Sequence, residues 1–369
     1  QGYETSGWLS QSANVQNGTD DAPFMAAAGK SVVVTGANGH LGCALVLDLL
    51  NHGYQVTATV RDPSDLRKTA HLRDAAEGMG AAERLDIVAG DLMDADCWGD
   101  ILAGKDGLFQ VAAVYSTMSK NPQEDIIDPS IVGTLNPLRA AAEQGVGRVV
   151  YTSSIAAVGG MPEGRAKTES DWNENFSLPY TYAKTESEKR AWALAEECGL
   201  DLRVCNPGMI WGPHFSRHTP STEIMSNLIR GKYPMAAKIG FAIVDSRDVA
   251  SAHRLAYEIE SAEGRFLLSA IDLQFIDMGK RVKAVEPKAK VPKIRAPWPL
   301  VQVNLFFDWG MGLFGRKRTM SRAIVKSMRR GTSIYDCSKS HKVLGWKPRP
   351  LEETIRDTID ACRQLEGRA

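Results

Sequence analysis

Three residues near the middle of the chain have the side chains and the spacing needed to reduce a carbonyl group. Tyr180 and Lys184 are four residues apart in Tyr180-Thr-Tyr-Ala-Lys184, so on a helix they share one face, one turn apart. Carbonyl reduction needs a proton at the oxygen as hydride reaches the carbon. A tyrosine can supply this proton if a nearby ammonium group lowers its pKa from about 10. We therefore predict Tyr180 as the acid and Lys184 as the cation that activates it.

Ser154 completes this predicted group. It follows an apolar run that predicts a strand, 26 residues before Tyr180, where its hydroxyl can hold and polarise the substrate oxygen. A tyrosine and a lysine at this spacing also occur by chance on surface helices, and Ser154 favours the catalytic interpretation. Tyr182 lies inside the same motif, but only Tyr180 has a lysine four residues later.

A glycine-rich turn in the first third predicts a dinucleotide site. The turn Gly36-Ala-Asn-Gly-His-Leu-Gly42 lies between a β-branched strand (31–35) and a helix (43–50), and a second strand follows (55–60). The first glycine allows the tight turn, the second lets the backbone approach the pyrophosphate, and the third lets the helix pack close to the strand. The free N–H groups of the helix then face the phosphates. The residues expected around the pyrophosphate are Thr35, Gly36, Asn38, Gly39, His40, Leu41 and Gly42.

The end of the second strand indicates which cofactor is used. Arg61 follows this strand, with Lys68 a little further on, and a guanidinium suits the 2′-phosphate of NADP(H). We predict a preference for NADP(H). The alternative is that Arg61 is solvated and Asp62 binds the ribose hydroxyls, which gives NAD(H).

The alternation of strands and helices continues, and it predicts an α/β fold with a Rossmann-type, doubly wound parallel sheet. Further strands are expected at 84–88, 107–114 and 148–151, with a helix around 133–141. The Rossmann domain is predicted over residues 29–210, with Ser154, Tyr180 and Lys184 in it. Residues 211–369 are expected to be mainly a smaller C-terminal substrate-binding region, from which about 240–260 return to the Rossmann domain. Residues 1–28 have no apolar run and are interpreted as a disordered extension or an expression remnant.

The motifs together resemble the extended short-chain dehydrogenases/reductases, in the branch of dihydroflavonol reductases, cinnamoyl-CoA reductases and hydroxysteroid dehydrogenases. They are the glycine turn, Gly90-Asp-Leu92, Thr152-Ser-Ser154, Tyr180 to Lys184 and Asn206-Pro-Gly-Met-Ile-Trp-Gly-Pro213. The resemblance runs from about residue 30 to about residue 256. It selects Ser154 over Ser153, implies that Lys184 reaches the nicotinamide ribose, and makes Tyr180 part of the cofactor contact. The remaining cofactor contacts that it implies are Asp91, Leu92, Val111, Ala112, Ala113, Pro207, Gly208 and Met209.

The substrate side is less well specified. Many reductases of this branch have a histidine where Gln110 stands, so that wall of the pocket is expected to differ. Tyr115, Trp211 and His214 are candidates for substrate contact beside Ser154, and their character suggests a hydrophobic carbonyl or alcohol. Further elements are expected in the last third, namely helices at 220–230, 279–285 and 351–365 and a strand at 266–269.

An apolar and aromatic stretch from Trp298 to Phe314 has three open interpretations. It can be a core helix with a solvated basic face, a lid over a greasy substrate, or an amphipathic segment (298–318) on an anionic membrane surface. The surroundings are basic, with 14 Lys and Arg between Lys280 and Arg330 against two acidic residues. Gln302, Asn304 and Asp308 interrupt it, which makes it a poor transmembrane span.

Composition excludes some other classes. Lys+Arg and Asp+Glu are both 44, so no global basic field favours nucleic acid. The six cysteines form no Cys-x-x-Cys pair and indicate a reduced, cytoplasmic protein. His214 and His218 lack a third ligand at useful spacing, so we expect no metal site. Two other functions stay open, a nucleotide-sugar epimerase or dehydratase that holds NAD and a non-catalytic sensor of NADP(H), and a homodimer is compatible with each.

Overall fold

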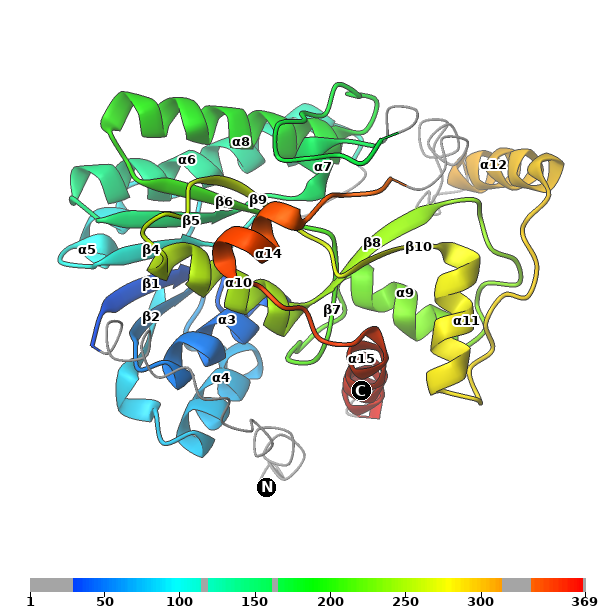
Figure 1. Ribbon diagram of the computed structural model, residues 1–369, viewed down its shortest axis with the longest axis horizontal. Coiled ribbons are helices and arrows are strands. Elements are labelled where there is room, and N and C mark those ends of the chain that lie inside the picture. The colour runs from blue at the N-terminus through cyan, green and yellow to red at the C-terminus, as the bar shows by residue number, and fades with distance from the viewer. Residues whose placement is uncertain (1–28, 114–118, 161–164, 314–332, 368–369) are drawn as a thin grey trace.

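A seven-stranded parallel sheet forms the centre of the computed structural model, which describes residues 29–113, 119–160, 165–313 and 333–367 (Figure 1). The strand order is β3-β2-β1-β4-β5-β6-β9, and every neighbouring pair is parallel. The strands are β1 (Ser31–Thr35), β2 (Gln55–Val60), β3 (Leu85–Ala89), β4 (Gly107–Gln110), β5 (Arg148–Thr152), β6 (Leu202–Pro207) and β9 (Gly264–Leu268). The predicted Rossmann-type fold is confirmed.

Helices cover both faces of this sheet. On one face α3 (His40–Asn51) packs against α10 (Ser246–Glu258), and on the other α6 (Asp128–Glu143) packs against α8 (Pro179–Cys198) (Figure 1). Alternate residues of β1 therefore enter different cores. Val32 and Val34 join the α3 side while Val33 joins the α8 side, and all three are fully buried. Burial on both faces explains why the strand reads as a continuous apolar run.

The chain leaves the sheet after β6 and forms a second, smaller sheet. Its order is β10-β8-β7, with β8 antiparallel to β10 and parallel to β7. Its strands and the helices packed with them are β7 (Met209–Trp211), α9 (Pro220–Ile229), β8 (Gly240–Asp245), β10 (Ile271–Gln274), α11 (Phe275–Val285) and α15 (Leu351–Gly367). Residues 246–268 return to the main sheet as α10 and β9. The chain therefore crosses from the main sheet to the smaller one and back again before it forms β10.

The remaining elements connect these layers, and several boundaries differ from the predicted ones. The connecting elements are α4 (Leu66–Gly78), η1 (Ala82–Arg84), α5 (Cys97–Leu102), η2 (Gln123–Ile127), α7 (Ile155–Val158), α12 (Trp298–Leu313) and α14 (Ser338–Leu344). The strand expected at 107–114 ends at Gln110, and the helix expected at 279–285 already begins at Phe275. Residues 1–28 and 314–318 lie outside the described residues, so those predictions stay predictions.

Helix α12 corrects one interpretation of the apolar stretch. Leu300, Val303, Phe306 and Phe307 are 47%, 49%, 67% and 64% exposed, while Val301 is buried. The spacing of the four exposed residues places them on one face of the helix. This face is apolar and exposed, so the interpretation of a core helix with a polar outer face is wrong for these positions. Among the described residues, the structure contains no helix that is long and apolar enough to cross a membrane.

Candidate active site

Helix α8 positions the predicted acid and its cation. Its first residue, Pro179, has no N–H to leave unpaired and suits a helix start. Tyr180 lies half-buried in the first turn, and Lys184 follows one turn later, buried. The Lys184 ammonium donates to the carbonyl oxygen of Thr152 at 3.5 Å, which places it at the carboxyl end of β5. Burial lowers the pKa of Lys184 to about 8, while the Glu188 carboxylate acts in the opposite direction.

The turn after β5 distinguishes the two serines. The Ser153 hydroxyl is buried and donates to Glu188 Oε2 at 2.5 Å. Ser154 is the N-cap of α7, and its Oγ accepts from the Ala156 N–H at 3.1 Å. This leaves the Ser154 hydroxyl hydrogen available for an acceptor such as a carbonyl oxygen. Because α7 packs against α8, the turn with Ser154 adjoins the helix with Tyr180 and Lys184.

The glycine turn has the geometry that a dinucleotide requires. Gly36 has φ +63°, and a Cβ on it would lie 2.9 Å from Ala112 Cβ. A Cβ on Gly42 would overlap the carbonyl oxygen of Gly36. Helix α3 begins at His40, and its N-cap Gly39 has no side chain to occupy the first N–H groups. The first and third glycines are thus needed for the turn and for close packing, and the helix N-terminus stays open to an anion.

Three residues predicted around the pyrophosphate turn their side chains into the protein. Thr35 is fully buried, donates to Gln110 Oε1 and accepts from the N–H groups of Val111 and Ala112, each at 2.9 Å. His40 and Leu41 are also buried. Their side chains are therefore not placed for cofactor contact, which leaves their backbone for that role. Asn38 is half-buried in the turn.

Gln110 has a different role from the one expected of a pocket wall. It is fully buried at the end of β4. Its amide accepts from Thr35 and donates to the carbonyl oxygens of Gly133 and Ala112 at 3.1 and 3.3 Å. The side chain thus joins β1, β4 and α6 behind the glycine turn instead of lining a pocket.

The end of β2 offers one cation that has no ion-pair partner among the described residues. Arg61 is exposed there. Lys68 pairs with Asp65 at 2.8 Å, and Asp65 is also the N-cap of α4. Asp62 accepts from both the hydroxyl and the N–H of Ser64, at 2.6 and 3.0 Å, and these hydrogen bonds lower the pKa of Asp62. Asp62 is thereby engaged within its own turn.

Other predicted cofactor residues also lie at or just beyond strand ends of the main sheet. Asp91 is exposed after β3, and the carbonyl of Leu92 accepts from Asn136 Nδ2 at 2.9 Å. Gly208 follows β6 and cannot hold a side chain, because a Cβ there would lie 2.5 Å from the Ala242 carbonyl oxygen. The residues between β4 and the next described segment are Val111, Ala112 and Ala113, and those at the end of β6 are Pro207, Gly208 and Met209. In parallel sheets, ligands bind beyond these carboxyl ends.

The predicted substrate residues do not form one group. Trp211 is 0% exposed, and its indole N–H donates to the Ser221 carbonyl at 3.1 Å. It belongs to the core of the smaller sheet, so the prediction of substrate contact is wrong for this side chain. Tyr115 lies outside the described residues.

His214 follows the smaller sheet's first strand in a left-handed backbone conformation. It has φ +71°, and the charges of Arg247 and Asp245 act on it in opposite directions. Burial lowers the pKa of His214 to about 3. His214 is half-buried just after Gly212 and Pro213, and its contact with substrate stays a prediction.

Two functional candidates escaped the sequence interpretation. Glu188 is one helical turn after Lys184, and Asn206 begins the Asn-Pro-Gly stretch at the end of β6. Asn206 Nδ2 donates to the Ser154 carbonyl at 3.2 Å and to Glu188 Oε2 at 2.8 Å. The four-residue spacing from Lys184 was the one signal in the sequence that could have indicated Glu188.

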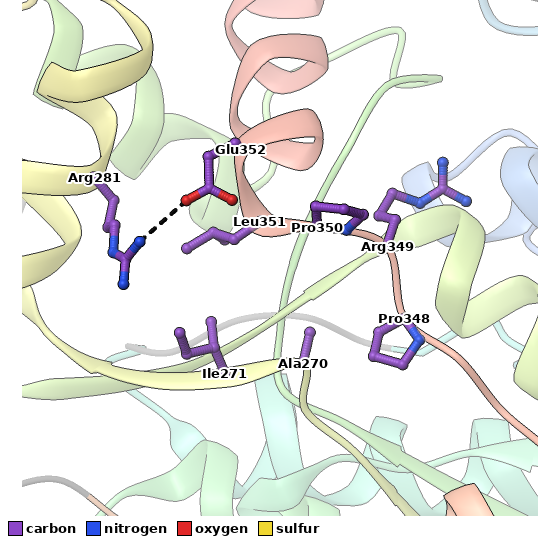
Figure 2. A pocket seen from close by; sticks show the side chains of 8 residues that line it. All are labelled: Ala270, Ile271, Arg281, Pro348, Arg349, Pro350, Leu351 and Glu352. Carbon is purple, nitrogen blue, oxygen red and sulfur yellow. Dashed lines mark hydrogen bonds and ion pairs between the residues drawn. The ribbon is translucent and has the colours of Figure 1, made fainter.

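A separate cleft of about 350 Å³ lies between β10, α11 and the start of α15 (Figure 2). Its lining residues are Ala270, Ile271, Arg281, Pro348, Arg349, Pro350, Leu351 and Glu352. Arg281 pairs with Glu352 at 3.1 Å, and Arg349 pairs with Asp248 at 2.9 Å. Both cations are satisfied within the protein, and no residue predicted for catalysis lines the cleft, so we assign the chemistry elsewhere. Within the described ranges, no group of three or more His, Cys, Asp or Glu is placed to hold a metal ion.

A doubly wound parallel sheet with a glycine turn after its first strand and a Tyr-x-x-x-Lys helix after its fifth is the arrangement of enzymes that use a nicotinamide dinucleotide. The family comparison agrees, since the model of the NAD dependent epimerase/dehydratase family matches residues 32–264. The chain belongs to this family, and the predicted resemblance to extended short-chain dehydrogenases/reductases and the predicted enzyme class are confirmed.

Named relatives lie in the predicted branch. The chain is 32% identical to a cinnamoyl-CoA reductase of Medicago truncatula, over 91% of this chain and 96% of that protein. It is 33% identical to a dihydroflavonol 4-reductase of Arabidopsis thaliana, over 71% of each chain. The crystal structure of the yeast methylglyoxal/isovaleraldehyde reductase complexed with NADPH has the same fold, with a TM-score of 0.71, 24% identity and coverage of 92% of this chain and 100% of that one.

Proposed function

We propose that this protein is an NADP(H)-dependent reductase of a ketone or aldehyde carried by a hydrophobic small molecule, which also oxidises the corresponding alcohol. Relatives in this branch include a cinnamoyl-CoA reductase and a dihydroflavonol 4-reductase. The observation that carries the proposal is the position of the Lys184 ammonium. It lies at the carboxyl end of β5, one helical turn from Tyr180 and at the turn that begins with Ser153 and Ser154.

Each residue of this group has a step that its position supports. Tyr180 gives its phenolic proton to the substrate oxygen, and its O–H bond breaks as the new one forms. The Lys184 ammonium, one turn further along α8, favours the phenolate that remains. The Ser154 hydroxyl, whose oxygen already accepts from Ala156, donates to the same substrate oxygen and polarises the carbonyl.

The residues present fit a dinucleotide. The glycine turn leaves no room for side chains at Gly36 and Gly42, and the start of α3 presents N–H groups to a pyrophosphate. When bound, the nicotinamide ring supplies the hydride that reduces the carbonyl carbon. Lys184 is buried beside the same strand ends, where it can hold the ribose hydroxyls.

The end of β2 supports NADP(H) over NAD(H). Arg61 is exposed and has no ion-pair partner among the described residues, so its guanidinium is available for a 2′-phosphate. Asp62, the group that would bind ribose hydroxyls in an NAD(H) site, is held by Ser64. Lys68 lies on the first turn of α4 and is already paired with Asp65, so Arg61 carries this part of the proposal.

The test is calorimetric binding of NADPH and NADH to the purified protein, followed by a screen at 340 nm with the tighter cofactor. The screen uses aldehydes, ketones and acyl-CoA thioesters. Tighter NADPH binding together with loss of absorbance on a hydrophobic carbonyl supports the proposal. NAD that stays bound through purification, without net oxidation of any substrate, would instead favour an epimerase or dehydratase of the same family.

A further inference from the structure

Behind the proposed catalytic group lies a carboxylate that is completely shielded from solvent. Glu188 is on α8, one turn after Lys184, and is 0% exposed. A buried carboxylate loses its hydration, which is costly unless the protein supplies hydrogen bonds and an opposite charge. Both are present here, and both come from elements that adjoin the proposed catalytic group.

The hydrogen bonds to Glu188 reach the two sides of the turn with Ser154. Ser153, the preceding residue, donates its hydroxyl to Oε2 at 2.5 Å. Asn206 of β6 donates Nδ2 to the same oxygen at 2.8 Å and also to the carbonyl of Ser154 at 3.2 Å. Oε2 of Glu188 therefore holds Ser153, the residue before Ser154, and also Asn206, whose side chain binds the backbone of Ser154.

The opposite charge comes from β9. Arg265 is buried, and its Nε lies 2.6 Å from Glu188 Oε1 as an ion pair without hydrogen-bond alignment, while Nη2 donates to Oε2 at 3.4 Å. The guanidinium is itself held in place. Its Nη1 donates to the carbonyls of Glu169 and Asp171 at 2.9 and 2.6 Å, and its Cζ lies 4.0 Å from the ring centre of Trp172.

The negative charge of Glu188 also acts on Lys184. Burial favours the neutral amine of Lys184, and the Glu188 carboxylate favours the ammonium. From other elements, the Thr152 carbonyl of β5 faces the ammonium. His253 of α10 accepts from the hydroxyl of the same Thr152 at 2.7 Å and is neutral, because burial lowers its pKa to about 4.

We propose that Glu188 is a positioning residue of this site: its single buried carboxylate holds the Ser154 turn in place and puts a negative charge one helical turn behind Lys184. Arg265 is the counter-ion that permits the carboxylate to remain charged inside the protein. This inference rests on the proposed function for its link to catalysis, although the placement of the charge can be tested without turnover.

The experiment is an NMR titration of Lys184 in protein labelled with ¹³C-lysine, with the signal assigned by its loss in Lys184→Arg. In Glu188→Gln the amide keeps the size of the side chain and removes the charge. We expect the Lys184 midpoint to fall by about one pH unit relative to the wild-type protein. Glu196→Gln, an exposed position on the same helix, is the matched control and should leave the midpoint unchanged.

Kinetics of the same variants provide the link to catalysis. In Glu188→Gln the loss of kcat/KM for reduction at alkaline pH should begin at lower pH by the same amount, and kcat should fall at every pH because Ser154 is less well held. If Glu188→Gln does not fold because Arg265 is left unpaired, the double variant Glu188→Gln/Arg265→Gln replaces it, with a smaller shift expected in the same direction.

The outcomes separate the two proposals. An unchanged Lys184 midpoint in a folded variant overturns the inference about Glu188, whatever the activity. A wild-type protein that reduces no carbonyl, with the midpoint shift present, overturns the proposed function and leaves the placement of the charge supported.

Discussion

Helices α8 and α12 differ in which side chains they bury and which they expose. Helix α8 buries Lys184 and Glu188, two charged residues that are rarely buried unless paired. Helix α12 exposes Phe306 and Phe307, two residues that are usually buried. The difference teaches that residue type alone does not decide burial. Charges are buried in α8 because the adjoining strand ends provide partners, whereas α12 keeps an apolar face largely exposed.

The largest effect is expected from the acid itself. Tyr180→Phe removes only the phenolic oxygen, so turnover should fall by about 10³-fold while NADPH binding is retained. Steady-state kinetics and calorimetry measure the two quantities. Tyr182→Phe, in the same helix and packed against Phe176, is the control and should retain activity. Normal turnover by Tyr180→Phe would show that Tyr180 is not the acid. The polar groups of α8 would then lack the catalytic role that distinguishes this helix from α12.

A second test measures the free-energy cost of burying the charged side chain of Lys184. Its pKa is lowered from 10.5 to about 8 in the folded protein. At pH values between about 8 and 10.5 the unfolded chain binds more protons than the folded protein, so the free energy of unfolding rises with pH in this range. Below about pH 8 the full free-energy cost of burying the charged lysine is present. Lys184→Met should therefore raise the free energy of unfolding at pH 7 by about 3 kcal/mol and abolish activity.

Denaturant unfolding at pH 7 and at pH 10 checks this prediction. The increase in the free energy of unfolding caused by Lys184→Met should be smaller at pH 10, because Lys184 is then uncharged in the folded wild-type protein. A variant that is less stable than the wild type at both pH values would mean that Lys184 contributes to packing instead of carrying a buried charge for function.

The third test concerns an exposed residue with a proposed role. Arg61→Asp reverses the charge at the end of β2 and should weaken NADPH binding by about 10- to 100-fold, because an ionic contact to a phosphate is lost. NADH binding should change little. Arg73→Asp, an exposed position on α4, controls for overall charge. An equal loss for both cofactors would place the 2′-phosphate elsewhere.

The smallest effect is expected on α12. Phe306→Ser and Phe307→Ser change residues that are already exposed, so the free energy of unfolding should change by less than about 0.5 kcal/mol. Leu45→Ala in α3, where the side chain is fully buried, should cost about 2–5 kcal/mol. A large loss of stability in the α12 variants would show that this face is covered in solution, and the contrast with α8 would then disappear.

The sequence was informative where residues are buried on both sides or lie close together in the chain. The strands of the main sheet are continuous apolar runs, such as Val32 to Val34, and could be predicted one by one. The glycine turn and the Tyr180–Lys184 pair could be predicted because their geometry is local. The role of Gln110 at the end of β4 could not be predicted, because its side chain is held by hydrogen bonds with Thr35 and Gly133, which are distant in the sequence.

The smaller sheet was harder to predict because it is assembled from three separate segments. Each residue of β10 is only half-buried, so the strand lacks a clear alternation. Trp211 was expected at the substrate because aromatic residues often line pockets, but the folding of α9 over β7 buries it. Glu188 looked like an ordinary helix residue, since its partner Arg265 is 77 positions away.

The return of the chain to β9 has a consequence for how the protein can be divided and for how it is made. A fragment that ends at residue 210 would contain the glycine turn, Ser154, Tyr180 and Lys184, but it would lack α10 and β9. Glu188 would then be without its cation, and α3 would have an uncovered apolar side. We therefore expect the nucleotide-binding half to fold poorly on its own, and during synthesis the main sheet can be completed only after the chain up to residue 268 has left the ribosome.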